Sequence, residues 1–465
     1  MKLKLYSTLT QQVGEVVPLN DNEIRMYTCG PTVHDYAHIG NFRTFVQFDL
    51  LRRTLKYFGF ALKHVMNITD VDDNIITKST AANMTLKEYT EIYANAFLED
   101  METLRIQRPE VMPRPTEHID SMVELIMKLR EKGFTYESEG STYFRIDRFP
   151  EYGKLAQLER RQGEAVGRID TDRYDKENPR DFVLWKARKP GEAYWDTPLG
   201  PGRPGWHIEC SAMSMQHLGS TFDIHCGGAD LVFPHHENEI AQSEAATGRP
   251  FAKRWLHCEF LMVNGQKMSK SLGNYYTLRG LLDKGYNPLA IRYLLASVHY
   301  RKQLNFTLEG LEQATAALQR VNDFVIRLRE VPGGAEDNPA LSQRTRDARA
   351  RFEEGLADDM NTSVALAAVF ELVRETNTLL ENNQVGPGNR DEILDFLSAA
   401  NQVFDVFQIE EQKLEDQEIV RLIEERREAR MRRDFRRSDE IRQLLAERGV
   451  ALEDTKEGTR WKRVI

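Results

Sequence analysis

The stretch Ile24-Arg-Met-Tyr-Thr-Cys-Gly-Pro-Thr-Val33 decides the fold, because it has the composition of a buried strand that ends in a Gly-Pro turn. A helix is predicted after Gly40, since apolar side chains recur at helical spacing from Phe45 to Leu55. Residues 61–68, Ala-Leu-Lys-His-Val-Met-Asn-Ile, predict a second strand. Strand, glycine turn, helix and strand form a βαβ unit, which indicates a parallel sheet with ligands at the strand ends.

The composition is typical of a globular protein with several domains. The chain has 465 residues, of which 41% are hydrophobic and 9% aromatic, so three or four domains are expected. No apolar run approaches the roughly 20 residues that span a bilayer. The first residues, Met1 to Tyr6, lack the features of a signal peptide. We therefore expect a cytoplasmic protein with no membrane partner.

Charge and cysteine content exclude two further classes. The net charge of −9 argues against a uniformly basic nucleic-acid wrapper, although one local basic face could still contact RNA phosphates. The cysteines are too few and too scattered for a disulfide framework. In a reducing compartment they are expected to be thiols or metal ligands. They are Cys29, Cys210, Cys226 and Cys258.

Changes in pattern divide the rest of the chain. A helix is expected near 117–132, and the aromatic, Gly-rich and Arg-rich segment that follows it indicates the strands and loops of an insertion. A second segment of the sheet is predicted over 222–225. The fold class is predicted to be α/β: a Rossmann-like parallel-sheet catalytic domain with an insertion, followed by a helical bundle and a small mixed C-terminal domain. The helices expected in the last part are 308–330, 341–357, 361–383, 389–407 and 417–447, followed by a hairpin over 452–464. The predicted domains are 1–115 with 206–255 (catalytic), 116–205 (connective insertion), 256–307 (a basic loop and its surroundings), 308–410 (helical bundle) and 411–465 (C-terminal domain).

The first candidate site is His38-Ile39-Gly40-Asn41, at the start of the predicted helix. A helix N-terminus presents N–H groups and a partial positive charge, which suit phosphate. Gly40 allows a nucleotide to approach the backbone, and imidazole and amide groups can donate hydrogen bonds to phosphate oxygens. Taken alone, such a tetrapeptide is more often an ordinary turn.

The second is Lys267-Met-Ser-Lys-Ser271, flanked by Gly265 and Gly273. Two ammonium groups on such a loop can close over a triphosphate and stabilise the charge that develops as pyrophosphate leaves. A solvated basic loop would look the same. In this order and separation, however, the two motifs resemble the signatures of class I aminoacyl-tRNA synthetases.

A third group of residues surrounds Gly228-Ala-Asp230 and Pro234-His-His-Glu-Asn-Glu239. An acid just past a glycine turn suits ribose hydroxyls. Residues four apart share a helical face, so His235 and Glu239 converge as half of a zinc site. Spacing alone also permits a pair of His236 with Glu239, and a polar helix start would show the same residues.

Longer motifs resemble one family, the cysteinyl-tRNA synthetases. The resemblance runs from about residue 3 to the C-terminus, and its motifs are Thr28–Val33, Asn67–Asp73, Arg203–Met213, Phe233–Glu239 and Leu452–Thr455. It implies activation of L-cysteine by ATP to cysteinyl-adenylate and transfer to the 3′-terminal ribose of tRNA(Cys). The implied partners are tRNA(Cys), ATP and L-cysteine, with Mg2+ accompanying ATP, and the protein is expected to be a monomer.

The resemblance also implies roles for particular residues. One Zn2+ ion per chain would be held by Cys29, Cys210, His235 and Glu239. Substrate cysteine would contact Thr69 and Trp206. ATP would contact Gly40, Gly228, Asp230, Ser269 and Lys270. Catalytic roles fall to His38, Asn41, Lys267 and Lys270, and His225 and His257 match histidines clustered in the family's active site. Zinc with an open position accepts a thiolate far better than a serine hydroxyl, which gives specificity without editing.

One position departs from the family pattern, since Asn41 stands where the signature usually has histidine. Asparagine can donate a hydrogen bond but cannot carry charge.

The arginine-rich stretch Arg426–Arg437 fits an RNA-binding C-terminal part, because guanidinium groups suit phosphates and stack on bases. The alternative is a solvated helix face paired with the nearby glutamates. The residues predicted to contact tRNA are Arg430, Arg433, Arg436, Arg437 and Trp461. The 308–410 bundle is expected to bind tRNA and the 411–465 domain to bind the anticodon, with the 256–307 region contacting the tRNA stem.

Two other functions would fit parts of the sequence. A related ligase forms the same adenylate and passes cysteine to an amino sugar, but it would not need an RNA-binding C-terminal part. A zinc-stabilised RNA-binding protein without catalysis would not need the two ATP motifs.

Overall fold

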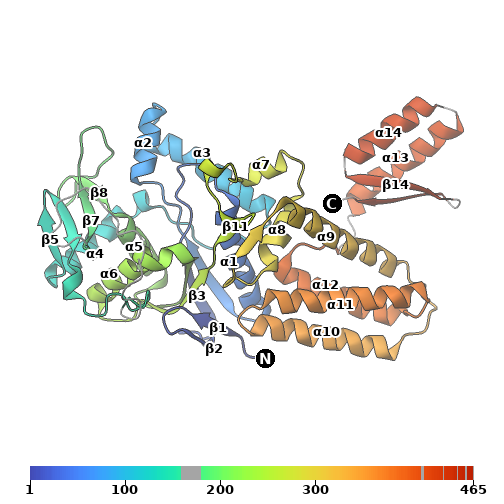
Figure 1. Ribbon diagram of the computed structural model, residues 1–465, viewed down its shortest axis with the longest axis horizontal. Helices are drawn as coiled ribbons and strands as arrows, with labels where there is room; N and C mark the ends of the chain where they lie inside the picture. The colour runs from blue at the N-terminus through green and yellow to red at the C-terminus, as the bar shows by residue number, and fades with distance from the viewer. Residues whose placement is uncertain (159–179, 410–412, 433, 448, 456–457, 464–465) are drawn as a thin grey trace. The chain divides into compact units, whose positions relative to one another are not determined.

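The computed structural model describes residues 1–158, 180–409, 413–432, 434–447, 449–455 and 458–463 (Figure 1). It has two compact units. The first comprises Met1–Gly285, Leu295–Thr307 and Glu353–Val364. The second comprises Tyr286–Leu294, Leu308–Phe352 and Ala365–Ile465. In the part of the chain that the structure describes, no helix is long and apolar enough to cross a membrane.

A four-stranded parallel sheet forms the centre of the first unit, in the order β10-β9-β3-β4. Its strands are β3 (Glu23–Thr28), β4 (Ala61–Met66), β9 (Phe222–Gly228) and β10 (Ala252–Cys258). Helix α1 (Ile39–Tyr57) connects β3 to β4, so the predicted βαβ unit is confirmed. The register pairs Thr28 with both Met66 and Cys226, which brings the carboxyl ends of three strands to one edge.

Helix α1 packs on this sheet as its spacing predicts. Phe48, Leu51 and Leu55 are buried in one apolar core with strand residues such as Ile24 and Ile224. The remaining elements of this unit are β1 (Lys4–Ser7), β2 (Gln12–Glu15), α2 (Asp73–Ala81), α3 (Leu86–Thr103), β11 (Leu261–Val263), β12 (Gln266–Lys267), α7 (Leu278–Leu282) and β13 (Leu304–Phe306). Most of α8 (Pro288–Ser297) belongs to the second unit.

The predicted insertion carries a second, antiparallel sheet in the order β5-β6-β7-β8. Its elements are α4 (Ile119–Glu131), β5 (Thr135–Ser138), β6 (Ser141–Phe144), β7 (Phe182–Ala187) and β8 (Gly202–Pro204). Ile126 and Trp185 of the insertion share a core with Ile208 of α5 (Trp206–Leu218) and Ala241 of α6 (Glu237–Thr247). The insertion is therefore packed against the two helices that carry the candidate metal ligands.

The last part of the chain is helical, as expected. Its helices are α9 (Leu308–Arg329), α10 (Pro339–Ala357), α11 (Thr362–Glu381), α12 (Pro387–Phe404), α13 (Lys413–Met431) and α14 (Phe435–Glu447), followed by a hairpin of β14 (Val450–Thr455) and β15 (Gly458–Arg463). The single helix predicted over 417–447 is wrong in one respect. The structure has two helices in this range, because α13 ends at Met431 and α14 begins at Phe435. The Asp434 carboxylate accepts a hydrogen bond from the Arg437 N–H and so caps the start of α14.

Candidate active site and metal-binding cluster

The first signature motif forms the N-terminal cap of α1. The His38 ring accepts a hydrogen bond from the Asn41 N–H at 3.1 Å, and the Asn41 side-chain oxygen accepts one from the His38 N–H at 3.1 Å. This reciprocal pair satisfies two backbone donors of the first helical turn. Asn41 therefore uses its amide oxygen for the cap, and its NH2 group is the part of the side chain suited to a ligand.

The second signature motif lies against the first. A methyl group on Gly40 would come within 3.2 Å of Met268 Cε and 3.0 Å of the His38 ring, so a larger residue there would press on both side chains. The Ile39 N–H also donates to the Tyr276 carbonyl at 3.0 Å. The Asn274 side chain holds the loop by accepting from the Ser269 N–H at 2.8 Å. Two motifs more than 200 residues apart in the sequence thus meet at one helix N-terminus.

For the two predicted lysines of that loop, the structure describes the side chain of Lys267 and only the backbone of Lys270. Lys267 ends β12 and is exposed, and neither it nor Ser269 is among the residues that line the neighbouring pocket. Lys270 begins a short 3-10 turn, Lys270–Leu272, of which the backbone position is described.

Four predicted metal ligands come together in the first unit. Cys29, Cys210, His235 and Glu239 are all buried, and their ligand atoms lie within 4.8 Å of one another. The two sulfur atoms are 3.9 Å apart, and the Cys29 sulfur is 3.8 Å from a Glu239 carboxylate oxygen. His235 Nε2 lies 3.0 Å from the same carboxylate oxygen.

Each ligand is positioned by a different element. Cys29 follows β3 directly, Cys210 lies in α5, His235 lies in a segment kinked at Phe233, Val232–His236, and Glu239 lies in the first turn of α6. The Nδ1 atoms of His207 and His235 share a hydrogen bond at 2.8 Å, which fixes the His235 ring so that Nε2 faces the cluster. The four ligands therefore come together only because α5 and α6 pack against the sheet.

Two of the four cluster groups are in the ionised form that a metal requires, whereas burial raises the pKa of Cys29 well above its usual value. Burial would lower the pKa of His235, but Glu239 and Cys210 raise it to about 10. A hydrogen bond from Cys29 lowers the pKa of Cys210 to about 6, against the opposing effect of burial. Burial alone would raise the pKa of Glu239, but His225 and His235 lower it to about 2. A thiolate and a carboxylate at neutral pH are the ionised forms that a metal requires of its ligands.

A second combination of ligands is also close enough to hold a metal. It contains Cys29 and Glu239 with His225 and His236. His225 Nε2 lies 2.8 Å from Glu239, but His236 Nε2 is 3.9 Å from it, and His236 Nδ1 is already hydrogen-bonded to His257 Nε2 at 2.8 Å. Both histidines are fully buried, whereas Cys29, Cys210 and His235 line the pocket. The set with Cys210 is therefore the one that a substrate could reach.

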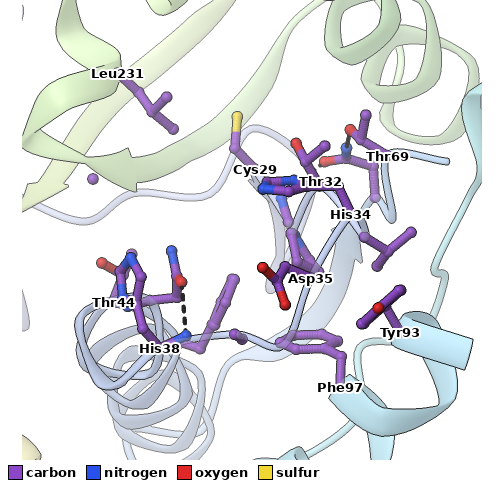
Figure 2. Close-up of a pocket in the computed structure, with 18 of the residues that line it drawn as sticks. Cys29, Thr32, His34, Asp35, His38, Thr44, Thr69, Tyr93, Phe97 and Leu231 are labelled. Atoms are coloured by element: carbon purple, nitrogen blue, oxygen red, sulfur yellow. Dashed lines mark hydrogen bonds between the residues drawn. The ribbon is translucent and has the colours of Figure 1, made fainter. Parts of the chain in front are cut away.

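The pocket has a volume of about 400 Å³, within the range of small-molecule sites. Figure 2 shows Cys29, Thr69, His38 and Leu231 around it, and Asn41, Trp206 and Asp230 also line it. The Trp206 ring stacks on the His235 ring, with centroids 4.1 Å apart. The Thr69 hydroxyl accepts a hydrogen bond from the Asn67 amide at 2.9 Å.

Asp230 is placed by a tight turn at the end of β9. It lies in a 3-10 turn, Ala229–Leu231, immediately after the strand. A methyl group on Gly228 would come within 2.3 Å of an Asp230 carboxylate oxygen, so any side chain at this position would displace that carboxylate. Gly228 and Asp230 both line the pocket.

Sequence reasoning did not identify several residues near the site. His207 is hydrogen-bonded to a candidate ligand, and Tyr275 lines the pocket with its ring 5.4 Å from the His38 ring. Tyr36, Lys78 and Tyr93 also line the pocket. For His207 a signal existed, because it lies three residues before Cys210 in the same predicted motif.

The predicted tRNA contacts lie in the second unit. Arg436 and Arg437 form ion pairs with Glu440, and Arg437 also pairs with Glu425. Trp461 is partly buried and packs against the small apolar core of α13, α14 and β14. Arg430 lies in the last turn of α13, and Arg433 falls outside the described residues. The pairing of arginines with glutamates is thus present, as the alternative interpretation expected.

Family models agree with the arrangement of the fold and the site. Residues 15–316 match the tRNA synthetases class I (C) catalytic domain, and residues 351–409 match the DALR domain. Among solved structures, Mycobacterium tuberculosis methionyl-tRNA synthetase in complex with methionyl-adenylate has a TM-score of 0.63 at 14% identity, covering 82% of this chain and 90% of that chain. A putative arginyl tRNA synthetase from Campylobacter jejuni has a TM-score of 0.54 at 13% identity, covering 83% and 91%. The fold and the site therefore define a class I aminoacyl-tRNA synthetase.

Sequence relatives specify the family. The chain is 54% identical to the cysteine–tRNA ligase of Solibacter usitatus (strain Ellin6076) over 100% of both chains. It is 48% identical to the cysteine–tRNA ligase of Brachyspira hyodysenteriae over 98% of both. The chain belongs to the cysteine–tRNA ligase family, which confirms the resemblance. These full-length matches and the DALR domain argue against both rival functions.

Proposed function

We propose that this protein activates L-cysteine with ATP and transfers it to tRNA(Cys), with one Zn2+ ion bound by Cys29, Cys210, His235 and Glu239. The observation that supports this most is the position of the buried cluster. It lies at one side of the pocket that also contains His38 and Asp230. An amino-acid side chain at the cluster and a nucleotide at the start of α1 would be close enough to react.

The donor atoms of the cluster fit zinc. Two thiolate sulfurs, an imidazole nitrogen and a carboxylate oxygen are ligands that Zn2+ accepts with tetrahedral geometry, whereas Mg2+ prefers oxygen ligands alone. When bound, zinc supplies a soft Lewis acid that favours a thiol over the hydroxyl of serine. The Trp206 ring stacks on the His235 ring and covers one face of this ligand.

The protein's own residues would act by positioning and by stabilising charge. Trp206 and Thr69 would orient the substrate, whose carboxylate attacks the α-phosphate of ATP as pyrophosphate leaves. In our proposal His38 and the NH2 group of Asn41 donate hydrogen bonds to the phosphates, and Asp230 accepts from the ribose hydroxyls. No residue needs to form a covalent intermediate.

The glycines and the second signature loop complete the nucleotide site in this proposal. Gly40 and Gly228 allow close approach of ATP to the backbone. Lys267, Ser269 and Lys270 close over the triphosphate, and Mg2+ accompanies ATP. Because Met268 already contacts the turn at Gly40, a small movement of the loop would suffice.

We further propose that tRNA binds through the helical C-terminal half, including the 351–409 DALR segment and the arginines of α13 and α14. A cytoplasmic, monomeric enzyme is part of the same proposal.

Charging of unfractionated tRNA with labelled cysteine, with serine as the control amino acid, tests the function. Charging with cysteine alone supports it. Cysteine-dependent exchange of pyrophosphate into ATP without any charging would contradict the tRNA step, and absence of both would contradict the activation step.

A further inference from the structure

Two buried cations of the insertion lie side by side on neighbouring strands. Lys186 of β7 and Arg203 of β8 face each other in the antiparallel register. Their side chains are only 9% and 3% exposed. Like charges directly opposite each other destabilise a sheet, and a buried cation needs a counter-charge. This pair of cations therefore requires an anionic partner.

The Asp73 carboxylate contacts both cations. One of its oxygens accepts a hydrogen bond from Lys186 Nζ at 2.7 Å, and the other forms an ion pair with the Arg203 guanidinium. Asp73 lies outside the insertion, since it is the first residue of α2. Glu192, by contrast, belongs to the insertion itself, and its carboxylate lies 3.2 Å from Arg203 Nε. Asp73 thus joins α2 to the insertion, whereas Glu192 does not.

One side of this bridge is tied to the wall of the pocket that carries Thr69. Thr69 lies four residues before Asp73, in the segment that connects β4 to α2, and it lines the pocket (Figure 2). The Thr69 N–H donates to the Pro31 carbonyl at 2.9 Å, and the Thr69 carbonyl accepts from the Val33 N–H at 3.1 Å. Asp73 is therefore held close to a wall that the chain leaving β3 fixes in place.

The other side of the bridge is tied to the wall that carries Trp206. Trp206 lies three residues after Arg203 and lines the pocket. Between these two residues, the Gly205 N–H donates to the Leu184 carbonyl at 2.9 Å. A methyl group on Gly205 would come within 2.1 Å of the Val183 carbonyl oxygen, so the chain lies tightly against β7. The position of Trp206 therefore follows that of the insertion sheet.

We propose that Asp73 is a positioning residue, which holds the Trp206 wall at the correct distance from Thr69 so that both side chains contact the substrate cysteine. This inference rests on the proposed function, because that function assigns Thr69 and Trp206 to the substrate. The Asp73 side chain is 60% exposed, so its truncation removes little packing. A shift of one wall by about 1 Å is enough to misplace the amino acid relative to ATP.

Asp73→Ala tests the proposal. The matched control is Glu192→Ala, which removes the other carboxylate that pairs with Arg203. We expect Asp73→Ala to raise the KM for cysteine in pyrophosphate exchange by about tenfold, while the KM for ATP and the zinc content change by less than about twofold. Asp73→Glu, which retains the charge, should recover most of the loss. An unchanged KM for cysteine in Asp73→Ala, or an equal rise in Glu192→Ala, would overturn the proposal.

A double variant separates positioning from stability. Asp73→Ala leaves the two facing cations with less counter-charge and should lower the thermal stability. Adding Lys186→Met removes one of these cations and should restore the thermal stability. The KM for cysteine should stay raised, because the tie between α2 and the insertion is still absent. Recovery of both quantities together would mean that Asp73 acts through stability alone, which would overturn the proposal.

The route through Trp206 is tested in a Trp206→Ala background. If Asp73 acts through Trp206, adding Asp73→Ala to this variant should raise the KM for cysteine by less than about twofold more, since coupled residues are not additive. A further rise of about tenfold would overturn the proposal. Failure of the proposed function is distinguishable, because the unchanged protein would then show no cysteine-dependent exchange.

Discussion

His235 Nε2 lies 3.0 Å from a carboxylate oxygen of Glu239, four residues further along the chain. The histidine belongs to the kinked segment Val232–His236 and the glutamate to the first turn of α6, so the pair forms where the kinked segment joins the helix. The hydrogen bond between His207 and His235 keeps the other ring nitrogen occupied. The pair is thereby directed at the two cysteine sulfurs rather than at solvent.

Cys210→Ala should remove the bound metal. The substitution deletes one of the four donors, and we expect the affinity for zinc to fall by at least about 100-fold, with a matching rise in the KM for cysteine. Metal analysis of the purified protein and titration with a chelator measure the first effect. Cys226→Ala is the control, because Cys226 is equally buried but belongs to the apolar core. Stoichiometric zinc in Cys210→Ala would refute the proposed ligand set.

Asn41 can be tested with two substitutions that separate its two groups. Asn41→Asp keeps an oxygen that accepts from the His38 N–H, but it lacks the NH2 donor and adds a negative charge near phosphate. Asn41→Ala loses both and should also destabilise the α1 cap by about 1 kcal/mol. If the NH2 group contacts ATP, Asn41→Asp slows pyrophosphate exchange at least about tenfold while thermal stability is retained. Unchanged exchange in Asn41→Asp would restrict Asn41 to helix capping.

Lys270→Ala should affect chemistry more than binding. We expect cysteine-dependent pyrophosphate exchange to slow by on the order of 100-fold, because one charge that stabilises the leaving pyrophosphate is lost. The dissociation constant for cysteine, measured without ATP, should stay within about threefold, since no ligand of the cluster changes. Lys253→Ala, at an exposed lysine of β10, controls for the loss of a surface charge. Normal exchange in Lys270→Ala would exclude this lysine from the mechanism.

Glu110 should make the stability of the first unit depend on pH. Burial would raise its pKa, but hydrogen bonds from the Arg52 side chain and the His64 N–H lower it to about 2. Because the folded pKa is below the ordinary value of about 4.3, the ionised carboxylate stabilises the fold above that pH. This contribution is lost as the pH falls from about 4.5 towards 2.

The corresponding measurement is urea unfolding of Glu110→Gln at several pH values. At pH 7 the variant should be less stable by about 1 kcal/mol, a modest value because Glu110 is partly exposed. The difference should narrow as the pH approaches 3.5. Glu102→Gln, at an exposed ion pair with Arg108, should show almost no difference at any pH. A difference that stays constant from pH 7 to pH 3.5 would contradict the assignment.

The sequence predicted the central fold because local signals are strong there. The buried strand at Ile24–Val33 and the apolar spacing of α1 depend on neighbouring residues only. Sequence spacing could not choose between His235 and His236 as the partner of Glu239, because spacings of three and four residues both place side chains on one helical face, and the tertiary structure puts the His235 nitrogen nearer, at 3.0 Å against 3.9 Å. The meeting of Cys29 with Cys210 depends on tertiary packing between residues 181 positions apart. The resemblance to a family, rather than periodicity, supplied that pair.

The packing of the insertion could not be predicted from local sequence patterns either. Its helix and strands were expected from local patterns, but its shared core with α5 and α6 was not. Side chains from Ile119 to Ala246 form this core, so no local window contains it. Three residues that line the pocket, Tyr36, Lys78 and Tyr93, were missed for a similar reason, since they come from three separate segments.

The arginines of α14 should differ in their contribution to tRNA binding. The Arg436 side chain is 91% exposed with an ion pair to Glu440, whereas Arg437 is 45% exposed and pairs with both Glu425 and Glu440. Exposed ion pairs contribute at most about 1 kcal/mol, so Arg436 can exchange its partner for a phosphate more easily. Arg437 would have to give up two partners.

We therefore expect Arg436→Ala to weaken tRNA binding more than Arg437→Ala. If Arg436 contacts one phosphate, its loss should reduce the slope of log affinity against log salt by about 0.7 to 0.9, and pyrophosphate exchange should be unaffected. Arg346→Ala removes an exposed arginine of α10 and controls for net charge. Equal effects of all three substitutions would mean that tRNA responds to overall charge. A larger effect of Arg437→Ala would mean that the two glutamates orient that guanidinium for the phosphate.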